Sequence, residues 1–206
     1  MRVLPPEVAH WIAAGEVIER PASAVKELME DALDAGATRV EVEIEGGEVA
    51  LVRVRDLGSG MSPEDAVTAV GRHAASKISS GEDLARVVSL GFRGEELHAI
   101  SSIATLTLTT HEAGASCATR VPVLAGGAPE RSPTAHPKGT TVEVRDLFMN
   151  LPVRPGFLGT ERTDTNALIT VVESLALSHP QVGFFLRSDG RGLLALPALW
   201  SPEAAA

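Results

Sequence analysis

One helical segment near the start of the chain constrains the fold more than any other stretch. Apolar residues recur at i, i+3, i+4, i+7 and i+8, which is the spacing of one face of a helix: Val25, Leu28, Met29, Ala32 and Leu33. Pro21 and Ser23 mark the start of this helix and Gly36 its end. The pattern predicts an amphipathic helix over residues 22–35, with this face turned to the protein core.

The opposite face of the same helix is acidic. Glu27, Asp31 and Asp34 fall at i, i+4 and i+7, so that three carboxylates share one stripe. Like charges at this spacing repel by roughly 0.2–0.5 kcal/mol per exposed pair, and a plain solvated face more often alternates in sign, as Lys26 and Glu30 do beside the stripe. Two interpretations follow: an acidic surface stripe, or a general base and a metal ligand held one turn apart.

Composition limits the classes of function. With 206 residues and 44% hydrophobic content, the chain can bury one substantial core. The net charge of −9 argues against binding nucleic acid through the overall field, and 3% aromatic residues argue against a base-stacking platform. The single cysteine, Cys117, excludes an intrachain disulfide and a cysteine-rich zinc site, and the six histidines show no metal-ligand spacing. Because neither a signal peptide nor a long apolar run is present, we expect a soluble cytoplasmic protein that does not contact a membrane.

A predicted β-hairpin follows the acidic helix. Residues 39–45 alternate between apolar and charged side chains, Gly46-Gly47 predicts a two-residue turn, and residues 49–55 form the return strand. Parity places Asp56 on the same buried face as the two valines of the return strand. A carboxylate on a buried face is costly unless hydrogen-bond donors reach it.

Asp56 begins the sequence Asp-Leu-Gly-Ser-Gly. Its two glycines, Gly58 and Gly60, allow the backbone to turn sharply and to approach another group closely. The pattern is neither a Rossmann fingerprint nor a phosphate-binding P-loop. The following Ser-Pro-Glu-Asp, starting at Ser62, is typical of a capped helix start with proline at the first helical position.

Residues 71–94 contain four glycines and several serines around one short helical piece, and they predict a mobile lid. The lid ends in the turn Gly91-Phe92-Arg93-Gly94, immediately before a helix predicted over residues 95–102. Backbone N–H groups at a helix N-terminus favour an anion. This Gly-x-x-Gly turn also permits a second interpretation, the nucleotide clamp of a KH-type RNA-binding module, which the acidic balance disfavours.

The rest of the chain predicts more strands and one long helix. Strands are expected over residues 104–110, 117–123, 141–145, 182–187 and 193–196, a helix over 161–178, and loops over 125–138 and 147–160. Thr140 shares a face with the inward-pointing valines of the strand that it precedes. It therefore presents a hydroxyl to the interior.

Together and in this order, these features resemble the GHKL ATPases. Within that class the chain resembles most closely the N-terminal ATPase region of the MutL mismatch-repair family, over about residues 3–190. The resemblance rests on the segments LPPEVAHWIAAGEVIERPASAVKEL, LDAGAT, RHAASKI, SLGFRGEEL, ISSIATLTLTT and HPKGTTVEVRDLF. It implies an α+β fold, a two-layer sandwich with a mixed, mostly antiparallel sheet and helices on one face.

The resemblance also implies a domain organisation. Residues 1–20 would form an N-terminal arm, 21–198 the ATP-binding domain and 199–206 a disordered tail. The family's second domain, which supplies a phosphate-contacting lysine and much of the dimer surface, is expected to be absent from this chain.

The resemblance further implies an ATP and Mg²⁺ site. Glu27 would be the general base, Asp31 the metal ligand, and Asp56 the acceptor for the exocyclic amine of adenine. Thr140 would bond near the adenine. The full set of residues expected to contact ATP is Asp31, Ala35, Asp56, Gly58, Gly60, Met61, Ser76, Lys77, Leu90, Gly91, Phe92, Arg93, Gly94, Glu95 and Thr140.

Several positions depart from the family pattern. Asp31 stands where asparagine is usual, which adds a negative charge beside the triphosphate and Glu27. Glu96 replaces a usual alanine within the phosphate turn, Leu57 a usual asparagine and Ala75 a usual threonine. The added charge of Asp31 favours weakened nucleotide affinity or altered metal dependence, and Glu96 places another negative charge near the phosphates.

Two functions from different classes follow. The first is a slow Mg²⁺-dependent ATPase that uses ATP to order the lid and to promote homodimerisation in mismatch repair, with a mismatch-recognition protein and DNA as partners of the parent protein. The second is a nucleotide-binding or scaffold module without significant turnover, which the charges of Asp31 and Glu96 favour.

Overall fold

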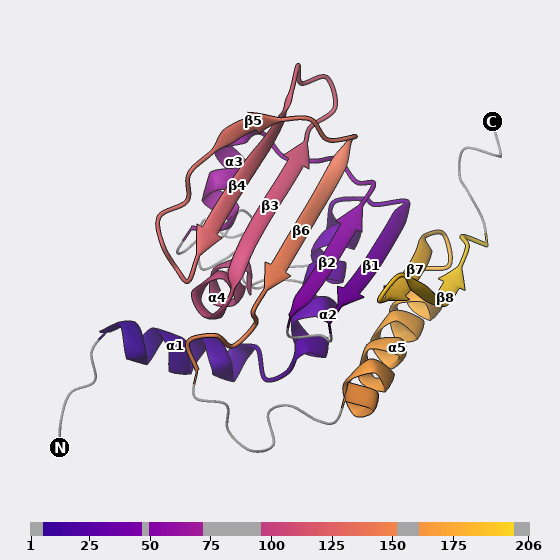
Figure 1. The fold of residues 1–206 in the computed structure, drawn as a ribbon. Coiled ribbons are helices and arrows are strands. Elements are labelled where there is room, and N and C mark those ends of the chain that lie inside the picture. The colour runs from indigo at the N-terminus through magenta and orange to yellow at the C-terminus, as the bar shows by residue number, and fades with distance from the viewer. Residues whose placement is uncertain (1–5, 47–49, 72–95, 152–160, 200–206) are drawn as a thin grey trace, which may run out of the picture.

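An eight-stranded sheet with helices packed against one face organises the chain (Figure 1). The computed structural model describes residues 6–46, 50–71, 96–151 and 161–199. The helices within these ranges are α1 (Pro6–Val17), α2 (Pro21–Asp34), α3 (Pro63–Ala69), α4 (Glu96–Ile103) and α5 (Glu161–Ser178). The strands are β1 (Arg39–Glu45), β2 (Leu51–Asp56), β3 (Thr105–His111), β4 (Ala118–Leu124), β5 (Ser132–Thr134), β6 (Gly139–Arg145), β7 (Gly183–Ser188) and β8 (Arg191–Leu196).

The strand order confirms the predicted α+β class. The sheet runs β5-β4-β3-β6-β2-β1-β7-β8. Within the described residues β1 and β7 form the one parallel pair, and the other neighbouring strands are antiparallel. In the view of Figure 1, α2, α3 and α4 lie behind the sheet. The architecture is therefore the expected two-layer arrangement with a mixed, mostly antiparallel sheet.

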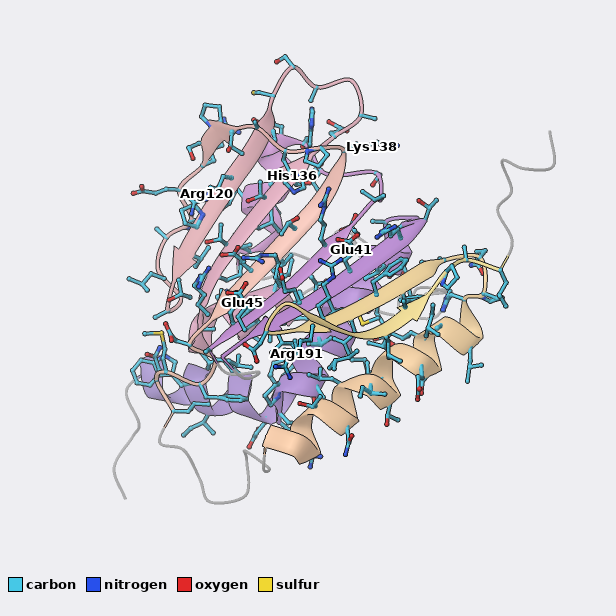
Figure 2. All side chains as sticks on the ribbon, turned by 45° about the vertical axis from the view of Figure 1, so that its right-hand side comes forward. Glu41, Glu45, Arg120, His136, Lys138 and Arg191 are labelled. Atoms are coloured by element: carbon cyan, nitrogen blue, oxygen red, sulfur yellow. The ribbon has the colours of Figure 1, made fainter. Side chains whose placement is uncertain are left out.

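The period-two alternation of the strands separates an apolar face from a polar one. Val42, Val54, Leu108 and Val142 are buried in the core beneath the helices. On the other face Arg53 bridges two neighbouring strands, with its Nη2 atom 2.9 Å from Glu143 and its Nη1 atom paired with Glu43. Figure 2 shows two further charged side chains of this face, Glu41 and Arg120. Among the described helices, none is long and apolar enough to cross a membrane.

Helix α2 buries the predicted apolar face. Val25 and Met29 are fully buried, and the backbone N–H groups of Gly36 and Ala37 close the helix by donating to the carbonyl oxygens of Leu33 and Ala32. One detail of the prediction is wrong. Glu30 does not lie on a solvated face but is only 7% exposed, and its carboxylate lies 2.8 Å from the Lys26 ammonium.

The hairpin between β1 and β2 differs from the prediction. Glu45 pairs with Leu51 and Ile44 with Val52, so five residues rather than two connect the strands. A two-residue turn at Gly46-Gly47 would have set Arg53 opposite Val40. The observed register instead sets the apolar side chains of both strands on the core face, because a shift of register changes which residues face each other across the ladder.

One further boundary was wrong. The loop predicted over residues 125–138 contains the short strand β5, which pairs with β4 at Ala118, Thr119 and Arg120. Helix α1 extends to Val17 and packs along α4. The predicted lid, residues 71–94, lies outside the described residues from position 72 onwards.

Gly139, the first residue of β6, permits the closest backbone approach near the end of β2. Its φ angle is +113°, and a Cβ atom built there would lie 2.2 Å from the carbonyl oxygen of Asp56. Gly114, in the turn between β3 and β4, has a φ angle of +88° but no atom within 4 Å of such a Cβ.

We therefore expect Gly139→Ala to lower the free energy of unfolding by about 3–5 kcal/mol, because backbone strain and a collision with fixed backbone act together. Gly114→Ala, the matched control, should cost only the strain of about 1–2 kcal/mol. Urea unfolding of both variants measures the difference. Equal losses would contradict the close packing of β2 against β6.

Candidate functional site

The carboxylate of Asp56 lies at the end of β2, on the buried face of the sheet. Asp56 is 7% exposed. Its Oδ1 atom accepts hydrogen bonds from the backbone N–H of Gly58 at 2.7 Å and of Thr140 at 3.2 Å. In the described part of the chain both donors reach the same oxygen. The other oxygen, Oδ2, is thus left as an acceptor for a group from outside.

The environment of Asp56 has opposing effects on its ionisation. Burial raises the pKa of the Asp56 carboxyl, and the N–H groups of Gly58 and Thr140 lower it, with burial the stronger effect. The need for donors inferred from the sequence is thus met in part by the protein backbone. A ligand that donates to Oδ2 would stabilise the charged form further.

The loop after Asp56 packs against the C-terminal end of α2. The N–H of Ser59 donates to the carbonyl oxygen of Ala35 at 3.0 Å. A Cβ atom on Gly58 would lie 2.9 Å from both that oxygen and the Asp56 Oδ1 atom. The absence of a side chain at Gly58 therefore allows the loop, the carboxylate and the helix end to meet.

The next two residues join this loop to β3. Gly60 has a φ angle of +73°, and a Cβ atom there would lie 2.1 Å from the carbonyl oxygen of His111. The N–H of Met61 donates to the Thr110 hydroxyl at 2.9 Å, and that hydroxyl lies 3.0 Å from the hydroxyl of Thr140. The structure thus brings together Ala35, Asp56, Gly58, Gly60, Met61 and Thr140, all of which were expected at the site.

Thr110 is a site residue that the sequence did not single out. It is 0% exposed and shares the inward face of β3 with Leu106 and Leu108. The signal was available, because the parity that drew attention to Thr140 applies equally to a threonine that follows two inward leucines.

The acidic stripe of α2 leads away from this cluster. Glu27, Asp31 and Ala35 stand at successive turns of the same side of the helix, with Glu27 half-buried and Asp31 exposed. At a rise of about 1.5 Å per residue, Asp31 and Glu27 lie about 6 and 12 Å along the axis from Ala35. A ligand that contacts both Asp56 and these carboxylates must therefore be elongated.

The donor set of Asp31 fits Mg²⁺ only if the ligand provides further oxygens. No group of three or more metal-ligating side chains occurs among the residues that the structure describes. Magnesium in phosphate sites is typically held by one or two carboxylates, with phosphate oxygens and water completing the shell. The exposed, hard oxygen of Asp31 is compatible with that arrangement.

The other expected site residues lie outside the described ranges. They are Ser76, Lys77, Leu90, Gly91, Phe92, Arg93, Gly94 and Glu95. The Gly-x-x-Gly turn that suggested either a phosphate contact or an RNA clamp belongs to this group.

Two histidines support the start of β6, although the six histidines showed no metal-ligand spacing in the sequence. The ring nitrogens of His111 lie 2.6 Å from the carbonyl oxygen of His136 and 3.1 Å from that of Ala115. The Nε2 atom of His136 lies 2.8 Å from the hydroxyl of Thr141. Figure 2 shows His136 near the end of the sheet where β6 begins. These contacts hold the segment that leads into Thr140, and no local spacing in the sequence indicated them.

Comparison with known proteins supports one family. Residues 18–126, more than half of the chain, match the family described as histidine kinase-, DNA gyrase B-, and HSP90-like ATPase. The DNA mismatch repair protein MutL of Pseudomonas putida (strain GB-1) is 52% identical over 197 residues, which are 95% of this chain and 31% of that protein. MutL of Neisseria meningitidis (strain Z2491) is 47% identical over 195 residues, 95% of this chain and 30% of that protein. The chain thus spans about a third of the length of these relatives.

Solved structures agree with this assignment. The Aquifex aeolicus MutL ATPase domain complexed with ADP is 37% identical, with a TM-score of 0.71 over 92% of this chain and 68% of that one. The N-terminal domain of a DNA repair protein is 28% identical, with a TM-score of 0.77 over 93% and 57% of the two chains. Sequence, sheet order and structural similarity all lead to one conclusion: the chain belongs to the GHKL ATPase family and, within it, to the MutL proteins of DNA mismatch repair.

Proposed function

We propose that this chain binds ATP with Mg²⁺ and hydrolyses it slowly, as a conformational switch in mismatch repair. The observation that carries the proposal is the Asp56 carboxylate, whose Oδ1 atom is held by two backbone N–H groups while its Oδ2 atom is available to a ligand. The related MutL ATPase domain of Aquifex aeolicus forms a complex with ADP, which supports an adenine nucleotide as that ligand.

The base of the nucleotide would lie at the cluster around Asp56. Its exocyclic amine donates to Asp56, and Thr140 contacts the same edge of the ring. Gly58 and Gly60 would allow the base to approach because they let the loop pack closely against Ala35 and the end of β3. Ala35 and Met61 would provide apolar contact at the end of α2 and after the loop.

The phosphates would extend along the acidic stripe of α2. Glu27 orients and polarises the attacking water, about two turns of the helix from the position where the base is held. Asp31 offers the oxygen that holds Mg²⁺, which when bound neutralises charge on the phosphates. Residues Ser76, Lys77 and 90–95 cover the phosphates in this proposal, because their N–H groups and positive charges suit a phosphate chain.

The ordering of this segment would also connect the nucleotide to the N-terminal arm. Residues 72–95 run directly into α4, and α4 packs along α1. A nucleotide that fixes the segment thereby favours one position of α1, and we propose that this promotes homodimerisation. A mismatch-recognition protein and DNA are the proposed partners, on the strength of the MutL relatives. The similarity to DNA-repair proteins and the single Cys117 support a cytoplasmic location.

A second candidate is nucleotide binding without significant turnover. Asp31 and Glu96, in the first turn of α4, each add a negative charge to the proposed phosphate region. Calorimetry with a non-hydrolysable ATP analogue, combined with a phosphate-release assay, separates the candidates. Binding with release supports the first, binding without release the second, and no binding excludes both.

Asp56→Asn should separate folding from binding. The asparagine keeps an oxygen for the N–H groups of Gly58 and Thr140 but places an amide donor where Oδ2 accepts from the ligand. We expect the affinity for the ATP analogue to fall about 10- to 100-fold, the value of a hydrogen bond to a charged group. Titration calorimetry measures this, and unchanged affinity would remove Asp56 from the site.

The same variant should change the dependence of stability on pH. Because the pKa of Asp56 is raised in the folded state, the folded protein binds more protons than the unfolded chain between the two pKa values. Stability contributed by this group is therefore present at low pH and is lost as the pH rises through the raised value. In thermal unfolding from pH 3 to pH 8, the stability of Asp56→Asn should not show this decrease with rising pH. Parallel curves for the two proteins would contradict the assignment.

Glu27→Gln should remove hydrolysis and leave binding. The amide cannot accept a proton from water, so steady-state phosphate release should fall about 10²- to 10⁴-fold, the usual contribution of a general base. Affinity for the analogue should stay within a few-fold of the original. Glu173→Gln, on the exposed face of α5, is the matched control and should leave both quantities unchanged. Undiminished release by Glu27→Gln would show that another group activates the water.

Asp31→Asn should strengthen nucleotide binding. The substitution keeps a side-chain oxygen for the metal and removes one negative charge beside the phosphates, which is worth about 1 kcal/mol at 4 Å in water, or about fivefold in affinity. The gain should shrink with added salt, because Asp31 is exposed. Asp34→Asn, with the same loss of charge one turn further from Glu27, should give a smaller gain. Titrations with and without Mg²⁺ test both, and weaker binding by Asp31→Asn would contradict the charge argument.

A further inference from the structure

A buried pair of hydroxyl groups lies beside the Asp56 carboxylate. The Thr110 Oγ1 atom, at the end of β3, is 3.0 Å from the Thr140 Oγ1 atom, at the start of β6. Thr110 is 0% exposed and Thr140 7% exposed. Thr140 also donates its backbone N–H to Asp56. The hydroxyl pair is therefore a direct extension of the proposed base-binding cluster.

We infer that Thr110 is a positioning residue, which sets the direction of the Thr140 hydroxyl and thereby makes the site complementary to the N1 acceptor of adenine. The inference rests on the proposed function and adds a residue and a base atom to it.

The hydrogen-bond capacity of Thr110 carries the argument. A hydroxyl donates one hydrogen bond and accepts up to two. The Met61 N–H, at 2.9 Å, uses one acceptor position of Thr110. Two oxygens compete for the single Thr110 proton: Oγ1 of Thr140 at 3.0 Å and the carbonyl oxygen of Gly139 at 3.4 Å. Because O–H···O bonds are most favourable near 2.7–2.8 Å, the shorter contact takes the proton.

The direction of the Thr110 proton determines the direction of the Thr140 hydroxyl proton. If Thr140 accepts from Thr110, its own proton points elsewhere, and within the described residues its hydroxyl has Thr110 as its one partner. Thr140 thus presents a donor, next to the acceptor Oδ2 of Asp56. Adenine offers the complementary pair on one edge, a donor at the exocyclic amine and an acceptor at N1. Guanine offers the reverse pair, an acceptor at O6 and a donor at N1.

Because the Thr140 hydroxyl is buried, the direction of its proton affects the affinity for the base. A buried hydroxyl cannot exchange a mismatched partner for water, so an edge with the wrong donors leaves the site groups unpaired. In the absence of Thr110, the Thr140 hydroxyl would distribute over three staggered positions, and selecting one of them would cost about a factor of three in affinity.

The test compares ADP with 1-deaza-ADP, in which C–H replaces the N1 atom, by titration calorimetry of the full chain. The unmodified protein should bind ADP about fivefold more tightly than 1-deaza-ADP, which corresponds to the net contribution of one hydrogen bond. In Thr110→Val this ratio should fall to about twofold, because the direction of the Thr140 hydroxyl is no longer set. Thr110→Ser, which restores the hydroxyl, should return the ratio to about fivefold.

Thr109→Val is the matched control, with the same substitution on the adjacent, oppositely facing position of β3, and it should leave the ratio unchanged. If Thr110 had a purely structural role, Thr110→Val would lower the affinities for ADP and 1-deaza-ADP equally and leave their ratio constant. This outcome would overturn the inference. So would a ratio near one in the unmodified protein that still binds ADP. Failure to bind ADP at all would overturn the proposed function and the inference with it.

If Thr110→Val does not fold, Thr110→Cys serves instead, because a thiol is a weak donor and should give an intermediate ratio.

Discussion

The hydrogen bond between the Thr140 N–H and the Asp56 carboxylate is the contact on which the rest of the site depends. It joins the end of β2 to the start of β6, two strands that are adjacent in the sheet but separated by 84 positions in the chain. A buried carboxylate is stable only when donors reach it, so Asp56, the loop to Gly58 and the entry into β6 are mutually required. Gly139 makes the approach possible, since a side chain there would collide with the backbone of Asp56.

Helix α2 connects this contact to the remainder of the proposed site. One face buries Val25 and Met29 in the core, and the other carries Glu27 and Asp31. The position of the two carboxylates relative to Asp56 is therefore set by core packing and by the contact of Ala35 with the loop after β2. In the proposed function, this division would let the sheet hold the base while the helix faces the phosphates.

Several structural predictions were correct because they depend on residues close together in the chain. Periodicity identified α2, α5 and the strand at β6, and parity placed Asp56 and Thr140 on the buried face. Errors arose where distant partners decide. The β1–β2 connection is longer than its glycines indicated, because the register matches apolar faces. The short β5 forms only because the edge of β4 is available to it.

The sequence by itself determined the class of fold through its family resemblance. Side-chain periodicity, a local property of the backbone, determined the helix with an apolar and an acidic side and the inward aspartate and threonine. Only the tertiary structure decided that Thr110 meets Thr140 and that His111 meets His136. The two threonines are 30 positions apart and the two histidines 25 positions apart. Both pairs lie on segments that become neighbours once β3 and β6 pair. Strand order sets such contacts, and it follows from the free energy of the whole sheet rather than from any single stretch of the chain.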